Sequence, residues 1–277
     1  MRTGIRAALV AAVAALVCAL GGASAQAYTL PPADGQFDYQ IGGPYSPLSS
    51  VRVVSRDRTV APASGVYNVC YVNTFQTQPD EVPWWEANHP DLLLRNSSGR
   101  YVIDGEWNEI LLDTRTAAKR TALNAIFDGW FRRCKADGFD AIEPDNLDSW
   151  TRSKKLITQA NNVALMRLFI PTAHAADLAI AQKNTSEIAG LGLGFDFAIA
   201  EECQVYTGEF GRECDDFVHY YGDLVYEIEY TDNQRNGDGG LGWFNAACTA
   251  RGSRISVILR DRLVTPFGDA AYRYSYC

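Results

Sequence analysis

The sequence has few histidines, no paired-cysteine metal motif and no long apolar run after its first residues. Only three of the 277 residues are histidine, and neither a C-x-x-C nor an H-x-x-x-H spacing occurs. These absences argue against a structural zinc site and against a centre built on a histidine pair. No run after residue 25 approaches the ~20 apolar residues that span a bilayer. We therefore expect no metal, no other cofactor and no internal transmembrane helix.

The chain is also short of basic residues. It carries 25 lysines and arginines against 33 aspartates and glutamates, a net charge of −8. Such a balance argues against nucleic acids and anionic membranes as partners and suits a cationic ligand. Solubility alone explains the same excess of acid, so charge by itself identifies no ligand.

The first residues have the pattern of a secretory signal peptide. Arg2 and Arg6 supply the basic start, residues 7–20 form a short apolar core, and Ala23-Ser24-Ala25 offers small residues for cleavage. We predict cleavage near Ala25 and a secreted protein in which residues 26–277 form one domain. Removal of two arginines and no acid makes the net charge −10. We expect this product to be a monomer.

Six cysteines remain after the predicted loss of Cys18, and an even number is typical of disulfides in an exported chain. Spacing is only a weak guide to their pairing. The shortest spacing favours one pair, a second would hold the C-terminus, and the third follows by elimination: Cys203–Cys214, Cys248–Cys277 and Cys70–Cys134.

Short segments rich in valine, isoleucine, phenylalanine and tyrosine alternate with helical or loop stretches. Eight of them are predicted as strands: Phe37–Ile41, Val51–Asp57, Val66–Val72, Phe139–Glu143, Leu178–Lys183, Phe195–Glu201, Leu224–Tyr230 and Arg254–Arg260. Helices are predicted over Thr116–Ala136, Asn161–Leu168 and Thr185–Leu191. The alternation predicts an α/β fold, a single-domain (β/α)8 TIM barrel. A long insertion, with a strand-like piece at Ile110–Asp113, separates the third and fourth strands.

Two of these strands repeat one pattern. Residues 138–146 and 194–202 both begin with Gly-Phe-Asp, continue as an apolar stretch and end in carboxylates. Because Pro144 cannot donate to a ladder, the first strand is expected to end at Glu143, with Asp145 in the following turn. The carboxyl ends of barrel strands share one rim, so Asp145 and Glu201 are expected to face each other. Paired carboxylates across a cleft are typical of glycoside hydrolysis.

Residues close to these strand ends are candidates for substrate binding: Glu143, Asp148, Lys183, Glu202, Trp107 and Trp150. Each has a simpler explanation. An aspartate after a strand often caps the next helix. A lysine or glutamate at a strand end is often solvent-facing, and a tryptophan more often packs than stacks on a sugar.

Several segments, in this order, resemble glycoside hydrolase family 114. They are Cys70-Tyr71, Gly105-Glu106-Trp107, Leu112-Asp113, Asp137 to Asp140, Glu143 to Asn146, Lys183-Asn184, Phe195 to Ala198 and Glu201-Glu202-Cys203. The resemblance implies a TIM barrel with endo-α-1,4-polygalactosaminidase activity on a cationic amino-sugar polymer, which an acidic cleft would attract. It also implies that Asp145 is the nucleophile and Glu201 the general acid/base.

The chain departs from the family pattern at Ala200, where asparagine is usual. That departure leaves open a catalytically inactive barrel that only binds carbohydrate. A secreted phosphodiesterase on a similar barrel is a further alternative, although such enzymes generally rely on a histidine pair or a metal.

Overall fold

A computed structural model describes residues 28–210, 213–234 and 237–277 of the chain. The predicted signal peptide and its cleavage site lie outside these residues. Within the described ranges, no helix combines the length and apolar character needed to cross a bilayer.

The described strands form one sheet of nine, in which neighbours along the chain are also neighbours in space. The first eight are parallel and each lies within two residues of its predicted bounds: β1 (Phe37–Tyr39), β2 (Val53–Asp57), β3 (Tyr67–Asn73), β4 (Ala141–Asp145), β5 (Ala179–Lys183), β6 (Phe197–Glu201), β7 (Val225–Tyr230) and β8 (Ser256–Arg260). This arrangement confirms the predicted TIM-barrel class.

A ninth strand, β9 (Tyr274–Tyr276), was not predicted and runs antiparallel to β8. It helps to close the barrel at the junction of β1 and β8, where side-chain hydrogen bonds connect the two ends of the sheet. The backbone N–H of Phe37 on β1 donates to Ser256 Oγ at 3.1 Å, and Tyr274 donates its hydroxyl to the Phe37 carbonyl at 2.7 Å. The Arg260 guanidinium donates to the carbonyl of Tyr39.

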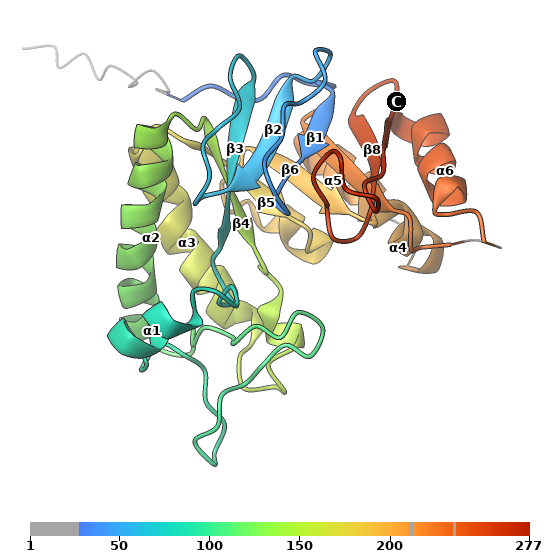
Figure 1. Cartoon of the computed structure of the whole chain (residues 1–277). Coiled ribbons are helices and arrows are strands. Elements are labelled where there is room, and N and C mark those ends of the chain that lie inside the picture. The colour runs from blue at the N-terminus through green and yellow to red at the C-terminus, as the bar shows by residue number, and fades with distance from the viewer. Residues whose placement is uncertain (1–27, 211–212, 235–236) are drawn as a thin grey trace, which may run out of the picture.

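Helices cover the outside of the barrel (Figure 1). On one side lie α2 (Ala117–Asp137) and α3 (Gln159–Ala175), and on the other α4 (Cys203–Phe210), α5 (Glu213–Tyr221) and α6 (Leu241–Arg251). Thr116 caps the start of α2 by accepting from the Lys119 N–H, and Gly138 ends it at a left-handed φ of 101°. Both predicted long helices are present, and α3 extends beyond its expected bounds. The third predicted helix is the 3₁₀ segment η2 (Ser186–Leu191).

Alternate strand residues point to opposite sides of the barrel wall. One buried cluster takes an apolar side chain from nearly every strand and fills the interior, and two others lie between the wall and the helices. On β4 the interior residue is Ala141, so Glu143 and Asp145 follow it on the same side. On β6, Phe197 and Ile199 are interior and Glu201 continues that series.

The expectation that the fourth strand ends at Glu143 is wrong. β4 continues to Asp145 and stays paired with β3 through Val72↔Pro144 and Asn73↔Asp145. Its register with β5 ends at Ile142↔Ile180, so Pro144 lies where only one neighbour still pairs. Proline is tolerated at such an edge-like position. Asp145 is consequently aimed by a strand and not by a turn.

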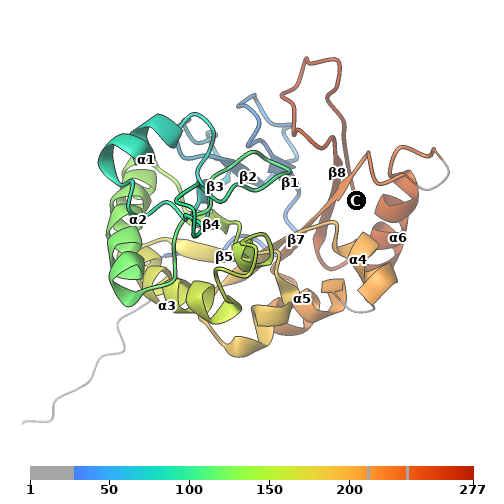
Figure 2. The ribbon, with the colours of Figure 1, turned by 90° about the horizontal axis from the view of Figure 1, so that it is seen from below.

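The connection between β3 and α2 lies at the carboxyl ends of the strands, as Figures 1 and 2 show. It contains α1 (Val82–Asn88) and isolated antiparallel bridges that include Ile103↔Ile110 and Leu93↔Leu112. The strand-like piece expected at Ile110–Asp113 therefore forms single bridges and not a strand.

All three expected disulfides are present and their pairing is confirmed. The sulfur–sulfur distances are 2.09, 2.04 and 2.07 Å for Cys70–Cys134, Cys203–Cys214 and Cys248–Cys277. The last bond ties α6 to the end of β9. The first joins β3 to α2 across the core.

Candidate active site

A cavity of about 350 Å³ opens where the strands of the barrel end. Inward-facing side chains from six strands form its wall: Tyr39, Tyr71, Asp145, Lys183, Glu201 and Tyr230. The connection before α2 adds Asp104, Glu106, Trp107 and Glu109. Asp145 and Glu201, predicted from separate sequence segments, thus line the same cavity.

Lys183 at the end of β5 lies between the carboxylates. Its side chain is only 1% exposed, and its Nζ lies 2.9 Å from Glu143 Oε1, 3.2 Å from Glu201 Oε2 and 3.6 Å from Asp145 Oδ1. Nζ also donates to the Tyr39 hydroxyl at 2.8 Å. Burial acts to lower the pKa of Lys183, but the three carboxylates outweigh it and hold that pKa well above its usual range. The lysine therefore carries its charge at any physiological pH.

Asp145 is held as a carboxylate. Tyr71 donates its hydroxyl to Asp145 Oδ2 at 2.6 Å. Burial acts to raise the pKa of Asp145, yet the Lys183 ammonium and the hydrogen bond from Tyr71 prevail, so the pKa lies below its usual value. Glu143 differs, because it is fully buried and burial raises its pKa despite the opposing Lys183 ammonium and Ser55 hydrogen bond.

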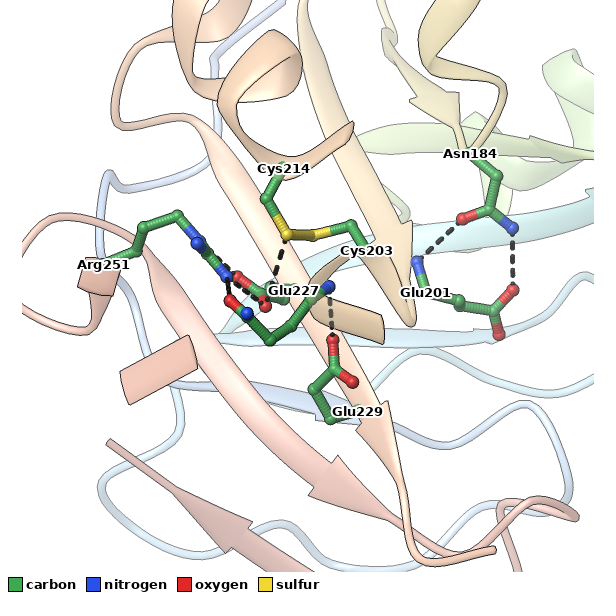
Figure 3. The surroundings of a disulfide bond; sticks show 8 residues. Asn184, Glu201, Cys203, Cys214, Glu227, Glu229 and Arg251 are labelled. Carbon is green, nitrogen blue, oxygen red and sulfur yellow. Dashed lines mark hydrogen bonds and ion pairs between the residues drawn. A yellow bond between two sulfur atoms is a disulfide. The ribbon is translucent and has the colours of Figure 1, made fainter. Parts of the chain in front are cut away.

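Glu201 is oriented by side chains at two neighbouring strand ends, and Figure 3 shows one of them, Asn184. Asn184 donates from Nδ2 to Glu201 Oε2 at 2.9 Å and accepts the Glu201 backbone N–H at 2.7 Å. The Tyr230 hydroxyl donates to Oε1. One amide thus fixes both the backbone and the carboxylate of Glu201.

Contacts on the outer side of the barrel wall hold the residues directly after Glu201, as Figure 3 also shows. Cys203 is joined to Cys214, and the Gln204 N–H donates to Glu229 Oε1 at 3.0 Å. Burial and the neighbouring carboxylate of Glu227 raise the pKa of Glu229 to about 9. These contacts anchor the first turn of α4, and with it the end of β6.

The residues that follow three consecutive strands share an unusual backbone conformation. Asn146, Asn184 and Glu202 have φ angles of 61°, 49° and 60°. Asparagine enters this left-handed region more readily than most residues, whereas glutamate does so at a cost. Ion pairing of the Glu202 carboxylate with Arg262, together with a hydrogen bond from Asn233, holds that conformation. The strands thus end in sharp turns that leave their last side chains facing the cavity.

The other predicted binding residues occupy different positions. Asp148, Glu202 and Trp107 line the cavity, and Trp107 is 45% exposed. Trp150 is half-buried and packs against apolar clusters below the connection, so a role for it in binding stays a prediction. Asp148 is paired with Arg152, whose Nη2 lies 2.9 Å from Asp148 Oδ1.

Sequence reasoning missed Tyr71, Asn184 and Tyr230 as site residues. Tyr71 and Tyr230 point into the barrel near the carboxyl ends of β3 and β7, and the alternation of inward and outward residues along those strands is the signal that could have identified them. Asn184 directly follows the inward-facing Lys183 at the end of β5. Glu109 was missed for a different reason. It lies in an irregular connection, where no periodicity predicts which way a side chain points.

Ala200, the departure from the family pattern, faces away from the cavity. It is fully buried in the cluster between β6 and the helices, beside Phe217 and Phe244. An asparagine at this position of β6 would not reach the carboxylates through the barrel wall. The departure therefore leaves the residues that line the cavity unchanged.

Among the described residues, one group of three possible metal ligands comes together, namely Cys203, Cys214 and Glu227. The two sulfurs are joined to each other, so neither is the thiolate that a metal would need. The three histidines, His89, His174 and His219, all lie outside the cavity wall. No observation in the described chain thus favours the phosphodiesterase alternative.

A parallel barrel that presents paired carboxylates at its strand ends has the architecture of the TIM-barrel glycosidases. The model of the glycoside-hydrolase family GH114 matches residues 19–277, and the chain belongs to this family of glycoside hydrolases. No curated protein matched the chain.

Solved structures share the fold at low sequence identity. Ega3 of Aspergillus fumigatus, in complex with galactosamine, is 18% identical over 90% of this chain and 97% of that chain, with a TM-score of 0.70. The glycoside hydrolase domain of PelA from Pseudomonas aeruginosa is 13% identical over 85% and 97%, with a TM-score of 0.60. A maltogenic α-amylase from Thermotoga neapolitana is 10% identical over 82% and 67%, with a TM-score of 0.50.

Proposed function

We propose that this protein is a secreted glycoside hydrolase that cleaves internal α-1,4 linkages of a galactosamine-containing polysaccharide. Family membership supports the hydrolase, and the galactosamine complex of the structurally similar Ega3 supports the sugar. Three disulfides support folding in an oxidising compartment, as expected of an exported protein.

The observation that carries the proposal is the charge of the cavity wall. Seven carboxylic residues line it, Asp104, Glu106, Glu109, Asp145, Asp148, Glu201 and Glu202, against three basic ones, Lys183, Arg152 and Arg262. All three cations are already paired with carboxylates. The remaining negative charge attracts a polymer of protonated amino sugars.

Asp145 is the proposed nucleophile and Glu201 the general acid/base. The low pKa of Asp145 keeps it ionised, as attack on an anomeric carbon requires. Both carboxylates lie within 4 Å of the same ammonium, so their nearest oxygens are at most about 7 Å apart, which suits a pair flanking one glycosidic bond. Each side chain is about one-fifth exposed and thus reachable from the cavity.

The remaining predicted residues divide by exposure. Lys183 and Glu143 are almost fully buried, so they act by holding Asp145 and Glu201 in place. Asp148 and Glu202 supply negative charge at the cavity wall. Trp107, with its half-exposed ring, offers an apolar surface for a sugar face.

The test is incubation of the purified protein with partly deacetylated poly-α-1,4-galactosamine and mass analysis of the soluble products. The wild type should release a ladder of short oligosaccharides. Asp145→Asn and Glu201→Gln should each lower turnover at least about a hundredfold while leaving the fold intact. Asp128→Asn, the same chemical change on the outer surface of α2, should cleave like the wild type.

Three results would count against parts of the proposal. Tight binding of the polymer without product would favour the inactive carbohydrate-binding barrel. Absence of both binding and product would mean that the sugar is wrong. Turnover near the wild-type rate in either carboxylate variant would refute the assigned residues.

A further inference from the structure

Glu109 is a cavity carboxyl that the proposed chemistry does not use. It follows a tight turn in the connection between β3 and α2, where the Asp104 N–H donates to the Glu109 carbonyl at 2.8 Å. In the same turn, the Asn108 N–H donates to the Asp104 carbonyl at 3.0 Å. The antiparallel bridge Ile103↔Ile110 pairs the residues on either side of the turn. Backbone hydrogen bonds therefore hold Glu109 in place although it belongs to no regular strand.

The side chain of Glu109 is oriented by Asn73 at the end of β3. Asn73 Oδ1 accepts from the Gln76 N–H at 3.0 Å and from Asn146 Nδ2 at 3.1 Å. The amide nitrogen of Asn73 is thereby left to donate, and it meets Glu109 Oε2 at 2.9 Å. Oε1 has no hydrogen-bond partner among the described residues. The residue is 9% exposed and lines the cavity.

The charges around Glu109 make its ionisation costly. Burial, together with the negative charges of Asp145 on β4 and Asp104 in the same turn, raises the pKa of Glu109 to about 8. The hydrogen bond from Asn73 and the charge of Arg152 oppose this rise without cancelling it. At neutral pH the carboxyl is mostly protonated. Because Oε2 accepts from Asn73, the proton resides on Oε1.

We propose that Glu109 receives the protonated amino group of a galactosamine unit and releases its own proton to water as that unit binds. The inference rests on the proposed function, since it assigns the residue that distinguishes an ammonium from an acetamide. One O–H bond of the carboxylic acid breaks, the proton leaves to solvent, and the carboxylate formed pairs with the ammonium. The empty site avoids a second anion beside Asp145, and the bound site holds a neutral ion pair.

An N-acetylated unit cannot drive this exchange, because its acetamide brings no positive charge. Glu109 therefore favours deacetylated segments of the polymer. Below pH 8, binding coupled to the release of one proton strengthens by about tenfold for each pH unit, provided that the sugar amine stays protonated.

The experiment is isothermal titration calorimetry with an α-1,4-linked galactosamine oligomer in buffers of different ionisation enthalpy, near pH 6.5. The protein carries Glu201→Gln so that no oligomer is consumed. The slope of observed enthalpy against buffer enthalpy gives the protons released per oligomer bound. We expect close to one, against none for the N-acetylated oligomer. Adding Glu109→Gln should abolish the release and weaken binding of the amino oligomer at least about tenfold. Adding Glu106→Gln, in the same turn, should retain the release.

Proton release that persists after Glu109→Gln is added would overturn the inference. With Glu201→Gln alone, binding of the amino oligomer without proton release would also overturn it, and so would the absence of binding. The function proposed above is judged separately, by whether the wild type cuts the polymer. An active enzyme without proton release at Glu109 would retain that function and lose only this assignment.

Discussion

Replacing Lys183 with methionine tests the arrangement of charge in the cavity most directly. The substitution keeps a long unbranched side chain and removes the ammonium that Glu143, Asp145 and Glu201 share. Two measurements should change, the free energy of unfolding and the pH profile of turnover. They depend on different carboxylates, so they report separately on the buried and the exposed parts of the cluster.

The effect on stability comes from Glu143. Its side chain and that of Lys183 are 0% and 1% exposed, so the substitution leaves a buried carboxylate without its cation. Removing one partner of a buried pair costs about 3–5 kcal/mol. Hydrogen bonds from Tyr39 and Ser55 remain, and the carboxyl can take up a proton, so we expect the lower end of that range. Urea unfolding at neutral pH measures it.

The sign of the pH dependence follows from the same residue. Loss of the ammonium raises the pKa of Glu143 further above its unfolded value. The added instability is therefore greatest at high pH, where the carboxylate must stay charged, and shrinks as the pH falls through the raised pKa. Unfolding curves at pH 5 and pH 8 should show a larger loss at pH 8.

The effect on turnover comes from Asp145. Its pKa is low because of Lys183 and Tyr71, so Lys183→Met should raise it and move the acidic limb of kcat/KM to higher pH. The double variant Lys183→Met/Glu143→Gln removes the unpaired buried charge. It should regain much of the lost stability but keep the shifted limb. A single Lys183→Met variant with wild-type stability and an unmoved limb would refute the reasoning.

Two further outcomes follow from the structure. Replacing Cys203 and Cys214 together with alanine should lower the free energy of unfolding by about 2–3 kcal/mol, because the bond closes a short loop; a denaturation midpoint equal to that of the wild type would contradict this. Restoring the usual family residue with Ala200→Asn should not raise kcat, because position 200 faces the helices. It should instead cost about 1–3 kcal/mol of stability by burying an amide among Phe217 and Phe244, and a faster enzyme would show that our placement of position 200 is wrong.

Much of the barrel was predictable because its signals are local. Most of the eight parallel strands are short runs with β-branched or aromatic residues, and Thr116 and Gly138, the residues that cap α2, are both ordinary boundary residues. Two features were not predictable in this way. β9 is too short to carry a pattern, and β4 continues past Pro144 because β5 has already stopped pairing there.

The candidate site also combines features that local sequence signals predict with features that depend on the tertiary structure. The two Gly-Phe-Asp segments, residues 138–146 and 194–202, predicted that Asp145 and Glu201 lie near the ends of two strands, because the order of residue types can be read along the chain. The charges that surround those carboxylates could not be predicted from the sequence. Lys183 is separated in sequence from Asp145 and Glu201, and only the curvature of the barrel brings its ammonium between them.

By itself, the sequence determined where the eight parallel strands lie and that acidic residues stand near the ends of two of them, since hydrophobic period and residue type act over short distances. Only the tertiary structure decided which face Ala200 occupies, which carboxyls stay charged and where Glu109 points. Those properties depend on burial and on charges a few ångströms away in space, contributed by segments that are distant along the chain.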